Sequence, residues 1–422
     1  MKKCSLLVSL FFIIQIATGQ NFQQYYGQAR EAFKGGDYAK FYESIVKASE
    51  LHPYHQGVMY YRGVAAALTN RPEEAVQYLH EAILVNAKFD LSIKELEALA
   101  SLPGFIKLRE EQLELQKPVV HSSTAFTLTD RTLHPESIAS GEKENAYYVS
   151  SVHKRKILKV DAGKVADFTT SAQDGITSLL GIKVDKVKKV LWACSSPMQE
   201  MENFDTLSRS AVFKYDLKSG KLLGKFTPDA SVKNSVFGDL ILNKKGEAFI
   251  SDTQSNTVFQ VNEATQKLEP YFTSDQFWNI QGIAFSVDER YLFIADYIKG
   301  LFRLDTQTKG LIQITREPMV SLKSIDGLMW YQHSLIAIQN GVTPMRVTRY
   351  FLSDTLDKIT RYEIIDRAHE SFNEPTNGCV IGDTLYYIAN SQWSGYDENH
   401  QLKPVEQLQD VVILKTNLKE IR

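Results

Sequence analysis

The sequence predicts two domains, an all-α domain of helical repeats followed by an all-β six-bladed propeller. One observation points to the propeller. Six times between Leu133 and Ile381, a polar or small residue leads into an apolar strand, a turn follows, and a second strand ends in small polar residues. Another observation points to the helical domain. In the first quarter of the chain, an apolar pattern of helical period repeats after 34 residues.

Each of the six units starts with a lead into what we expect to be the innermost strand of a blade. Measured at the last residue of each lead, the steps along the chain are 44, 58, 43, 45 and 51 residues. A blade of four antiparallel strands needs about 40–50 residues, so the period predicts one blade for each unit. The leads are Pro135-Glu136-Ser137-Ile138, Leu180-Gly181-Ile182, Gly238-Asp239-Leu240, Gln281-Gly282-Ile283, Asp326-Gly327-Leu328 and Asn377-Gly378-Cys379.

From Phe126 onward the apolar pattern has a period of two, which is typical of strands. Val411 to Lys415 is a late strand that we expect to close the ring against the first blade. The six predicted second strands are Ala146–Val149, Val190–Ala193, Glu247–Ile250, Tyr291–Ile294, Leu335–Ile338 and Leu385–Ile388.

The first nineteen residues have the features of an export signal. Lys2 and Lys3 form a positively charged start, Leu6 to Ile16 form an apolar run, and Ala17-Thr18-Gly19 is a cleavage site of small residues. An uncleaved membrane anchor is the alternative, although the apolar run is shorter than a membrane span requires. We expect residues 1–19 to be a signal peptide. The protein would then be exported from a bacterial cell, periplasmic or secreted, without a membrane span.

The charge and cysteine content of the sequence limit the kinds of partner and cross-link that we expect. The formal net charge is −2, and loss of Lys2 and Lys3 with the signal leaves about −4. No stretch is strongly basic, so nothing indicates a nucleic-acid partner. Cys194 and Cys379 fall on blades that are not neighbours, so we expect two separate thiols rather than a disulfide. No cysteine spacing is typical of zinc.

Residues 20–116 form the predicted helical domain, with turns at Gly36-Asp37-Tyr38 and Asn70-Arg71-Pro72. Two sets of small and aromatic residues resemble tetratricopeptide repeats, and residues 93–116 are expected to cap them. The resemblance implies either a protein or peptide partner on the repeats or simple docking on the propeller. The sets are Tyr25, Ala29, Phe41, Ala48 and Pro53, and Gly63, Ala66, Ala75 and Ala82. Residues 117–125 are expected to be a linker, with the propeller at 126–422.

Three leads resemble those of a known family. His134 to Ala139, Ile280 to Phe285 with Ile294-Ala295-Asp296, and Ser324 to Leu328 resemble the gluconolactonase and senescence-marker-protein superfamily. Paraoxonases and strictosidine-synthase-like proteins share its six-bladed architecture. The resemblance implies a divalent cation, usually calcium, at the bottom of the propeller channel.

The family holds this cation with a Glu from the first blade, Asn residues from middle blades and an Asp from a later blade. Glu136 and Asp326 match the Glu and the Asp. Gln281 stands in place of one Asn, and its amide oxygen is a ligand of the same kind that reaches one methylene further. Gly238 stands in place of the other and offers no side chain, although Asp239 follows directly.

Asn377 adds a further amide oxygen from the sixth blade. The predicted metal ligands are therefore Glu136, Asp239, Gln281, Asp326 and Asn377. The alternative for an acidic residue at this position, and for Asp239 above all, is a structural one, since such a side chain can cap a turn or bind backbone amides of the next blade.

The resemblance also implies hydrolysis of a lactone or a related ester, in which the cation polarises the carbonyl and an acidic residue or a histidine activates water. The catalytic candidates are Asp326 and His153, and the alternative for His153 is a solvated loop histidine. Ser195-Ser196 and Ser391-Gln392-Trp393 are candidates for lining a ligand pocket. The other function class is a non-catalytic binding or scaffold protein whose propeller channel holds a small molecule or partner. No Gly-x-Ser-x-Gly motif supports a serine hydrolase.

Overall fold

The computed structural model describes residues 21–232, 234–317 and 319–421. The chain divides after Lys117 into two compact units, a helical one and an all-β one. The predicted fold class, helical repeats followed by a six-bladed propeller, is confirmed. Residues 1–19, the predicted signal peptide, lie outside the described residues. Across the part of the chain that is described, no helix is long and apolar enough to cross a membrane.

The helical unit consists of consecutive helices joined by short turns, and both turns predicted from the sequence are present. The Asp37 side chain caps its helix by accepting a hydrogen bond of 3.0 Å from the Lys40 amide, and Pro72 begins another helix. Residues 21–34 are helical, and α2 (Tyr38–Leu51), α3 (Gln56–Leu68), α4 (Pro72–Val85), the 3-10 helix η1 (Lys94–Leu99) and α5 (Pro103–Gln116) follow.

Close packing between α3 and α4 explains one small residue of the repeat pattern. A Cβ atom at Gly63 would lie 2.6 Å from Cγ of Leu79 and 3.1 Å from the carbonyl oxygen of Ala75. Both distances are shorter than van der Waals contact, so only glycine lets the two helices approach this closely.

The first three blades each contain four antiparallel strands in chain order, with the first strand innermost. Blade 1 contains β3 (Ile138–Ser140), β4 (Ala146–Ser151), β5 (Lys156–Asp161) and β6 (Lys164–Asp167). Blade 2 contains β7 (Ser178–Asp185), β8 (Val190–Ser196), β9 (Ala211–Asp216) and β10 (Leu222–Phe226), preceded by the 3-10 helix η2 (Gln173–Gly175). Blade 3 contains β11 (Phe237–Leu242), β12 (Ala248–Asp252), β13 (Thr257–Asn262) and β14 (Lys267–Thr273).

The last three blades repeat this plan with additions. Blade 4 contains β15 (Ile280–Phe285), β16 (Tyr291–Asp296), β17 (Gly300–Asp305) and β18 (Leu311–Gln313). Blade 5 contains β20 (Ile325–Tyr331), β21 (Ser334–Gln339), β22 (Arg346–Leu352) and β23 (Lys358–Arg367), with β1 (Val119–Val120) and β19 (Thr315–Arg316) paired to β23. Blade 6 contains β24 (Gly378–Ile381), β25 (Thr384–Ile388), β26 (Val411–Asn417) and β2 (Ser123–Leu128). The 3-10 helices η3 (Trp393–Gly395) and η4 (Val405–Gln407) lie between β25 and β26.

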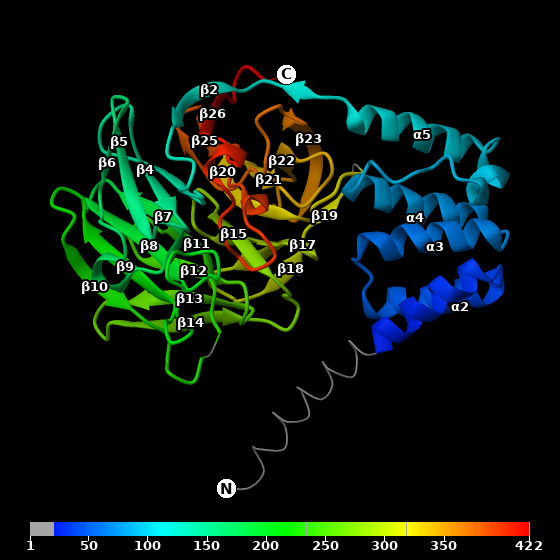
Figure 1. Cartoon of the computed structure of the whole chain (residues 1–422), viewed down its shortest axis with the longest axis horizontal. Helices are drawn as coiled ribbons and strands as arrows, with labels where there is room; N and C mark the ends of the chain where they lie inside the picture. The colour runs from blue at the N-terminus through cyan, green and yellow to red at the C-terminus, as the bar shows by residue number, and fades with distance from the viewer. Residues whose placement is uncertain (1–20, 233, 318, 422) are drawn as a thin grey trace, which may run out of the picture. The chain divides into compact units, whose positions relative to one another are not determined.

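The ring closes through β2, which is the outermost strand of blade 6. Val411 to Lys415 lies in β26, which pairs with β25 and with β2 rather than with a strand of blade 1, while Val411 and Ile413 share an apolar cluster with blade 1. Figure 1 shows the cyan β2 beside the red β26, although the two strands lie far apart in the sequence. Since β1 and the start of β2 fall within residues 117–125, the range expected to be a linker contains strands of the propeller.

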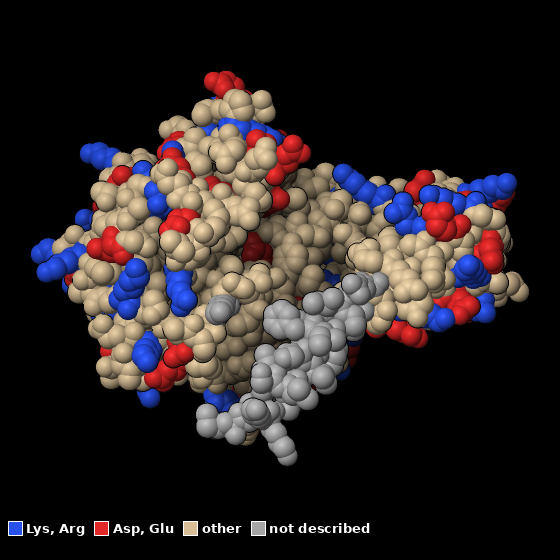
Figure 2. Space-filling view, turned by 60° about the horizontal axis from the view of Figure 1, so that its bottom comes forward, with Lys and Arg blue, Asp and Glu red and all other residues tan. Residues whose placement is uncertain are grey.

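Apolar clusters fill the interfaces between neighbouring blades. Leu191 and Phe213 of blade 2, for example, pack with Tyr148 of blade 1, and all three are buried. Equivalent clusters occur at the other blade interfaces, including that between blade 6 and blade 1. Burial of this apolar surface holds the ring together. On the face shown in Figure 2, Lys and Arg are interspersed with Asp and Glu, and neither sign gathers into a broad patch.

Candidate active site in the propeller channel

The innermost strands carry the six leads to the centre of the ring. These strands contact one another in the order β3, β7, β11, β15, β20 and β24, and β24 returns to β3. In blades 2 to 5 the register between the first and second strand shifts at the lead, as at Ile280/Ile283 and Ile325/Gly327. Such a bulge redirects side chains locally, so the lead residue leaves the strand alternation.

A cavity of about 350 Å³ lies among these leads and the loops beside them. Glu136, Gln281 and Asp326, three of the predicted site residues, line it together. The other lining residues are Leu180, Met198, Val236, Gly238, Thr253, Gln254, Tyr297, Asn340, Glu374 and Trp393.

Glu136 and Asp326 meet at the hydroxyl group of Thr376, which directly precedes the sixth lead. Oγ1 of Thr376 lies 2.8 Å from Oε2 of Glu136 and 2.8 Å from Oδ2 of Asp326. A hydroxyl group has one proton, so it donates to only one of these oxygens at a time. The second contact is favourable only if a carboxyl group is protonated or a cation lies beside the pair.

Donors surround Glu136. Its Oε1 accepts hydrogen bonds from Ser391 Oγ and, at 2.7 Å, from Trp393 Nε1, and Nε2 of His134 lies 3.6 Å away. Burial alone would raise the pKa of Glu136, but His134, Ser391 and Thr376 outweigh it and hold the pKa below its ordinary value. Glu136 is therefore the carboxyl group of the pair that stays ionised.

Asp326 has the opposite electrostatic character. Burial and then the negative charge of Glu136 raise the pKa of Asp326 to about 7, although Thr376 and Asn340 donate hydrogen bonds to it. Nδ2 of Asn340 donates to Oδ2 at 2.8 Å, and the Tyr297 hydroxyl donates at 2.9 Å to Oδ1 of Asn340. Asp326 thus exchanges a proton near neutral pH while its orientation is held by a hydrogen-bonded chain.

Gln281 also lines the cavity, and a neighbouring residue orients its amide. Its Nε2 donates a hydrogen bond of 2.6 Å to Oδ1 of Asn279. A Cβ atom at Gly238 would lie 3.0 Å from Oε1 of Gln281, so the missing side chain in blade 3 leaves room for the longer amide of blade 4. The two departures from the family pattern, Gly238 and Gln281, are thus complementary in shape.

Asp239 and Asn377 bond to each other rather than lining the cavity. Nδ2 of Asn377 donates to Oδ1 of Asp239 at 2.8 Å, and Oδ1 of Asn377 accepts from the Gly378 amide at 2.8 Å. Nζ of Lys183 lies 3.6 Å from the Asp239 carboxylate. Asp239 already faces a cation of the protein, and neither residue is among those lining the cavity.

His153 lies in the turn after β4 and is not among the lining residues either. Its Nδ1–H donates a hydrogen bond of 2.7 Å to the Glu200 carbonyl, and its Nε2 lies 3.7 Å from Glu202. Burial is the main reason that the pKa of His153 is lowered. The structure therefore does not bring His153 to Asp326.

Among the cavity lining, Tyr297, Asn340 and Glu374 were not singled out from the sequence, and neither was Thr376, which bonds to both carboxyl groups. Tyr297 and Asn340 directly follow the second strands of their blades, where the repeating unit ends in polar residues. Glu374 and Thr376 lie in the loop that enters the sixth lead. These residues could have been found by searching the polar residues at the ends of second strands and the residues just before each lead.

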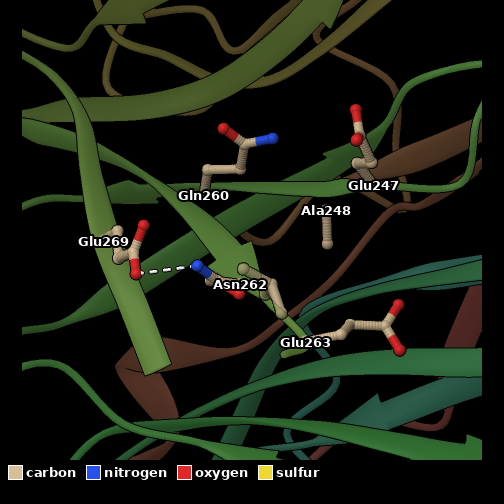
Figure 3. Close-up of a pocket in the computed structure, with 7 residues that line it drawn as sticks. Glu247, Ala248, Gln260, Asn262, Glu263 and Glu269 are labelled. Carbon is tan, nitrogen blue, oxygen red and sulfur yellow. Dashed lines mark hydrogen bonds between the residues drawn. The ribbon is translucent and has the colours of Figure 1, made fainter. Parts of the chain in front are cut away.

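A second cavity, of about 320 Å³, lies at the edge of blade 3 (Figure 3). Three glutamates line it, and each has a partner. Glu247 accepts from Asn243, Glu263 pairs with Lys214 at 2.6 Å, and Glu269 accepts from Asn262 at 2.9 Å. These carboxylates are already satisfied, so the channel cavity is the better candidate site.

The channel residues fit a cation with oxygen ligands. Oε2 of Glu136 accepts one hydrogen bond and Oδ1 of Asp326 has no recorded donor within the described residues, so both keep lone pairs. The single proton of the Thr376 hydroxyl cannot serve both carboxylates, so a cation would compensate the second negative charge. Among the described residues, no three His, Cys, Asp or Glu side chains cluster as a metal site, so Gln281 and the neutral oxygens would complete the coordination.

No protein-family model matches the sequence, and no curated protein matches it. Similar solved structures include PQQ-bound aldose sugar dehydrogenase from Streptomyces coelicolor, with 14% identity, a TM-score of 0.49, and coverage of 71% of this chain and 98% of that one. A protein assigned as a gluconolactonase has 15% identity, a TM-score of 0.47 and coverage of 73% and 96%. An inactive virginiamycin B lyase from Staphylococcus aureus, solved with quinupristin, has 12% identity, a TM-score of 0.47 and coverage of 70% and 98%. The neighbours thus include a member of the family that the leads resemble, and the fold of this chain is the six-bladed propeller given by its strand pairing.

Proposed function

We propose that the channel cavity hydrolyses a lactone or a related ester, with Asp326 as the general base. We also propose that Glu136, Asp326 and Gln281 hold a divalent cation, for which calcium is the ion that the family resemblance suggests. The observation that carries the proposal is the pair of carboxyl groups sharing one hydroxyl, each 2.8 Å from Thr376 Oγ1, inside a cavity of about 350 Å³.

The reaction requires a group that takes a proton and gives it back. Asp326 removes a proton from water as the water oxygen attacks the carbonyl carbon, and it returns that proton to the alkoxide as the carbon–oxygen bond of the ester breaks. Without a cation the pKa of Asp326 is about 7, and a bound cation would lower this pKa and keep the carboxylate ready to accept the first proton. Asn340, oriented by Tyr297, keeps the carboxyl group in place.

Glu136 supplies a fixed negative charge in this scheme. Its donors Ser391, Trp393 and Thr376 keep it ionised and immobile, so it does not compete with Asp326 for the transferred proton. A bound divalent cation would supply polarisation of the substrate carbonyl. His153 takes no part in the proposal, because it is not among the residues that line the cavity.

We further propose that the protein acts outside the cytoplasm, periplasmic or secreted, because of the charged start and apolar run in residues 1–19. The second candidate function is a binding protein without catalysis, with a small molecule in the channel and a protein or peptide on the helical unit. Gly238, in place of a ligand residue of the family, favours this alternative.

The test combines binding and activity. Calcium is titrated into chelator-treated protein by calorimetry, and lactones and esters are then screened with and without calcium. We expect one bound calcium per chain, calcium-dependent hydrolysis, and loss of both in Glu136→Gln combined with Asp326→Asn. The exposed Asp354→Asn variant is the control and should match the wild type. A wild type that binds calcium but hydrolyses no lactone or ester would favour the binding protein. Absence of calcium binding would contradict the metal site.

A further inference from the structure

The channel cavity is lined by carboxyl groups and by no basic side chain, although His134 lies beside Glu136 outside this lining, with its Nε2 3.6 Å from Oε1. Glu136, Asp326 and Glu374 all line it, and none of the lining residues, each within the described ranges, is Lys, Arg or His. This excess of negative charge is a property of the cavity lining, because Lys and Arg are mixed with Asp and Glu on the face shown in Figure 2. The cation proposed above would balance Glu136 and Asp326. Glu374 would remain as an unbalanced carboxylate.

The loop around Glu374 holds its side chain firmly. Oε2 accepts a hydrogen bond of 3.1 Å from the Ser394 amide, and the Ser391 amide donates at 3.1 Å to the Glu374 carbonyl. The residue has a φ of +62°, which non-glycine residues rarely adopt. Burial raises the pKa of Glu374, and the negative charge of Glu136 raises it further. The backbone amides of Ser394 and Trp393, which donate hydrogen bonds to the carboxylate, oppose this rise. The donating amides are neutral, and His134 influences the pKa of Glu374 less than burial, the amides and Glu136 do, so a cationic ligand would add the positive charge that this carboxyl group lacks.

Two aromatic residues line the same cavity. Burial raises the pKa of the Tyr297 hydroxyl, and the negative charges of Asp326 and Glu374 raise it further. Trp393 is held by the hydrogen bond from its Nε1 to Glu136. An organic ammonium group is attracted both to carboxylates and to aromatic rings, whereas a neutral sugar-like substrate gains nothing from an unbalanced charge.

We propose that the cavity selects a substrate carrying an organic ammonium group, and that Glu374 is the residue that binds this group. The inference rests on the proposed function, since it assigns Glu136 and Asp326 to the divalent cation and leaves Glu374 for the substrate. It makes Glu374 a specificity-determining residue and gives it no role in proton transfer.

A pair of probes that differ only in charge tests the inference. Choline and 3,3-dimethylbutan-1-ol have the same shape, and the second replaces the ammonium nitrogen by carbon. Each is titrated by calorimetry into the full chain with saturating calcium. We expect choline to bind at least tenfold more tightly than the alcohol. Glu374→Gln should weaken choline binding about tenfold, or about 1.4 kcal/mol, because the amide keeps an acceptor for Ser394 but loses the charge.

Controls separate this outcome from the alternatives. Glu247→Gln, in the cavity of blade 3, should leave choline affinity unchanged, and equal thermal melting of all variants shows that they fold. Equal binding of the two probes, or no binding of either, overturns the inference. So does choline binding that Glu374→Gln does not weaken, for instance where choline only displaces calcium from Glu136 and Asp326.

Hydrolysis is measured separately with acetylcholine and its uncharged analogue 3,3-dimethylbutyl acetate. Hydrolysis of the charged ester with a kcat/KM at least tenfold higher than that of the neutral one supports the ammonium site in catalysis. Hydrolysis of both esters at equal rates overturns the inference and leaves the proposed function standing. If choline binds through Glu374 and neither these esters nor the lactones are hydrolysed, the hydrolase function fails and the ammonium site stands.

Discussion

Thr376 connects the two carboxyl groups on which the candidate site depends. Its buried hydroxyl has one proton and two carboxyl oxygens at 2.8 Å, so protonation of Asp326 and the position of Glu136 are coupled. The sequence could predict Glu136 and Asp326, since both occupy the same position of a repeating unit. It could not predict Thr376, because nothing in a single sequence says which neighbour of a lead reaches across the channel.

Thr376→Val tests this coupling. Valine has nearly the same shape but no hydroxyl, so Asp326 loses a donor and its pKa should rise further. We expect the rise of kcat/KM with pH to move to higher pH, with more than a tenfold loss of activity at pH 7. Thr376→Ser keeps the hydroxyl and should restore the wild-type pH profile. A valine variant with an unchanged profile would contradict the role of the shared hydroxyl.

Asp326→Asn should stabilise the protein while abolishing hydrolysis. The folded state raises the pKa of Asp326 to about 7 from an ordinary value near 4. Between these values the folded state binds more protons than the unfolded state, so stability falls as pH rises from about 4 through about 7. The variant lacks this loss and should be more stable by about 4 kcal/mol at pH 8, with the gain shrinking toward pH 4.

Urea unfolding of chelator-treated protein across this pH range measures the effect. Asp354→Asn, at an exposed position, is the control and should show the wild-type pH dependence. Saturating calcium should reduce the difference, because a cation beside Asp326 favours its ionised form. A variant less stable than the wild type at pH 8 would mean that ionised Asp326 is stabilising.

At the scale of elements, glycine in the leads lets neighbouring inner strands approach. A Cβ atom at Gly181 would lie 2.8 Å from Cα of Asp239, and one at Gly327 would lie 3.0 Å from Cα of Asn377. In each case the glycine of one blade contacts the lead of the next. The sequence marks these positions by their recurrence, but the contact across blades, and the bulges at the leads of blades 2 to 5, follow only from the closed ring.

Gly282→Ala tests this packing next to the site. A Cβ atom there would lie 2.6 Å from the Leu328 amide nitrogen and 2.7 Å from the Asp326 carbonyl oxygen, and both are backbone atoms. We expect a loss of about 3 kcal/mol in unfolding free energy, since backbone of blade 5 must move. Gly310→Ala, which meets only the Thr308 hydroxyl at 3.3 Å, is the control and should lie within about 0.5 kcal/mol of the wild type. Chemical unfolding measures the stability of both variants, and equal stability would contradict the close packing of inner strands at Gly282.

At the scale of the whole molecule, the ring depends on strands from both ends of the β unit. The strand β2 supplies the outer edge of blade 6, and the segment before it is anchored to blade 5. Asp366 is fully buried and accepts hydrogen bonds from the amides of His121 and Ser122, at 3.0 and 3.1 Å. It also accepts from the Tyr387 hydroxyl at 2.9 Å and from the Ser122 hydroxyl.

Asp366→Asn should therefore weaken closure. The amide directs two protons toward groups that are themselves donors, so at least one buried donor loses its acceptor, at a cost of about 3 kcal/mol. We expect a lower urea midpoint and faster trypsin cleavage near Lys117, while Asp354→Asn behaves as the wild type. Normal stability together with slow cleavage would show that Asp366 does not hold the segment before β2 in place.

The sequence by itself determined the two domains, the number of blades, the six second strands and the meeting of Glu136 with Asp326. This was possible because the period of apolar residues and the repeat length are local properties of the sequence that recur in every unit. Only the tertiary structure decided how the ring closes, why Asp239 and Asn377 pair with each other, why Glu374 lines the cavity and why Thr376 reaches both carboxyl groups. These features join residues about 50 to 290 positions apart, and their positions depend on the geometry of the closed ring rather than on any local pattern.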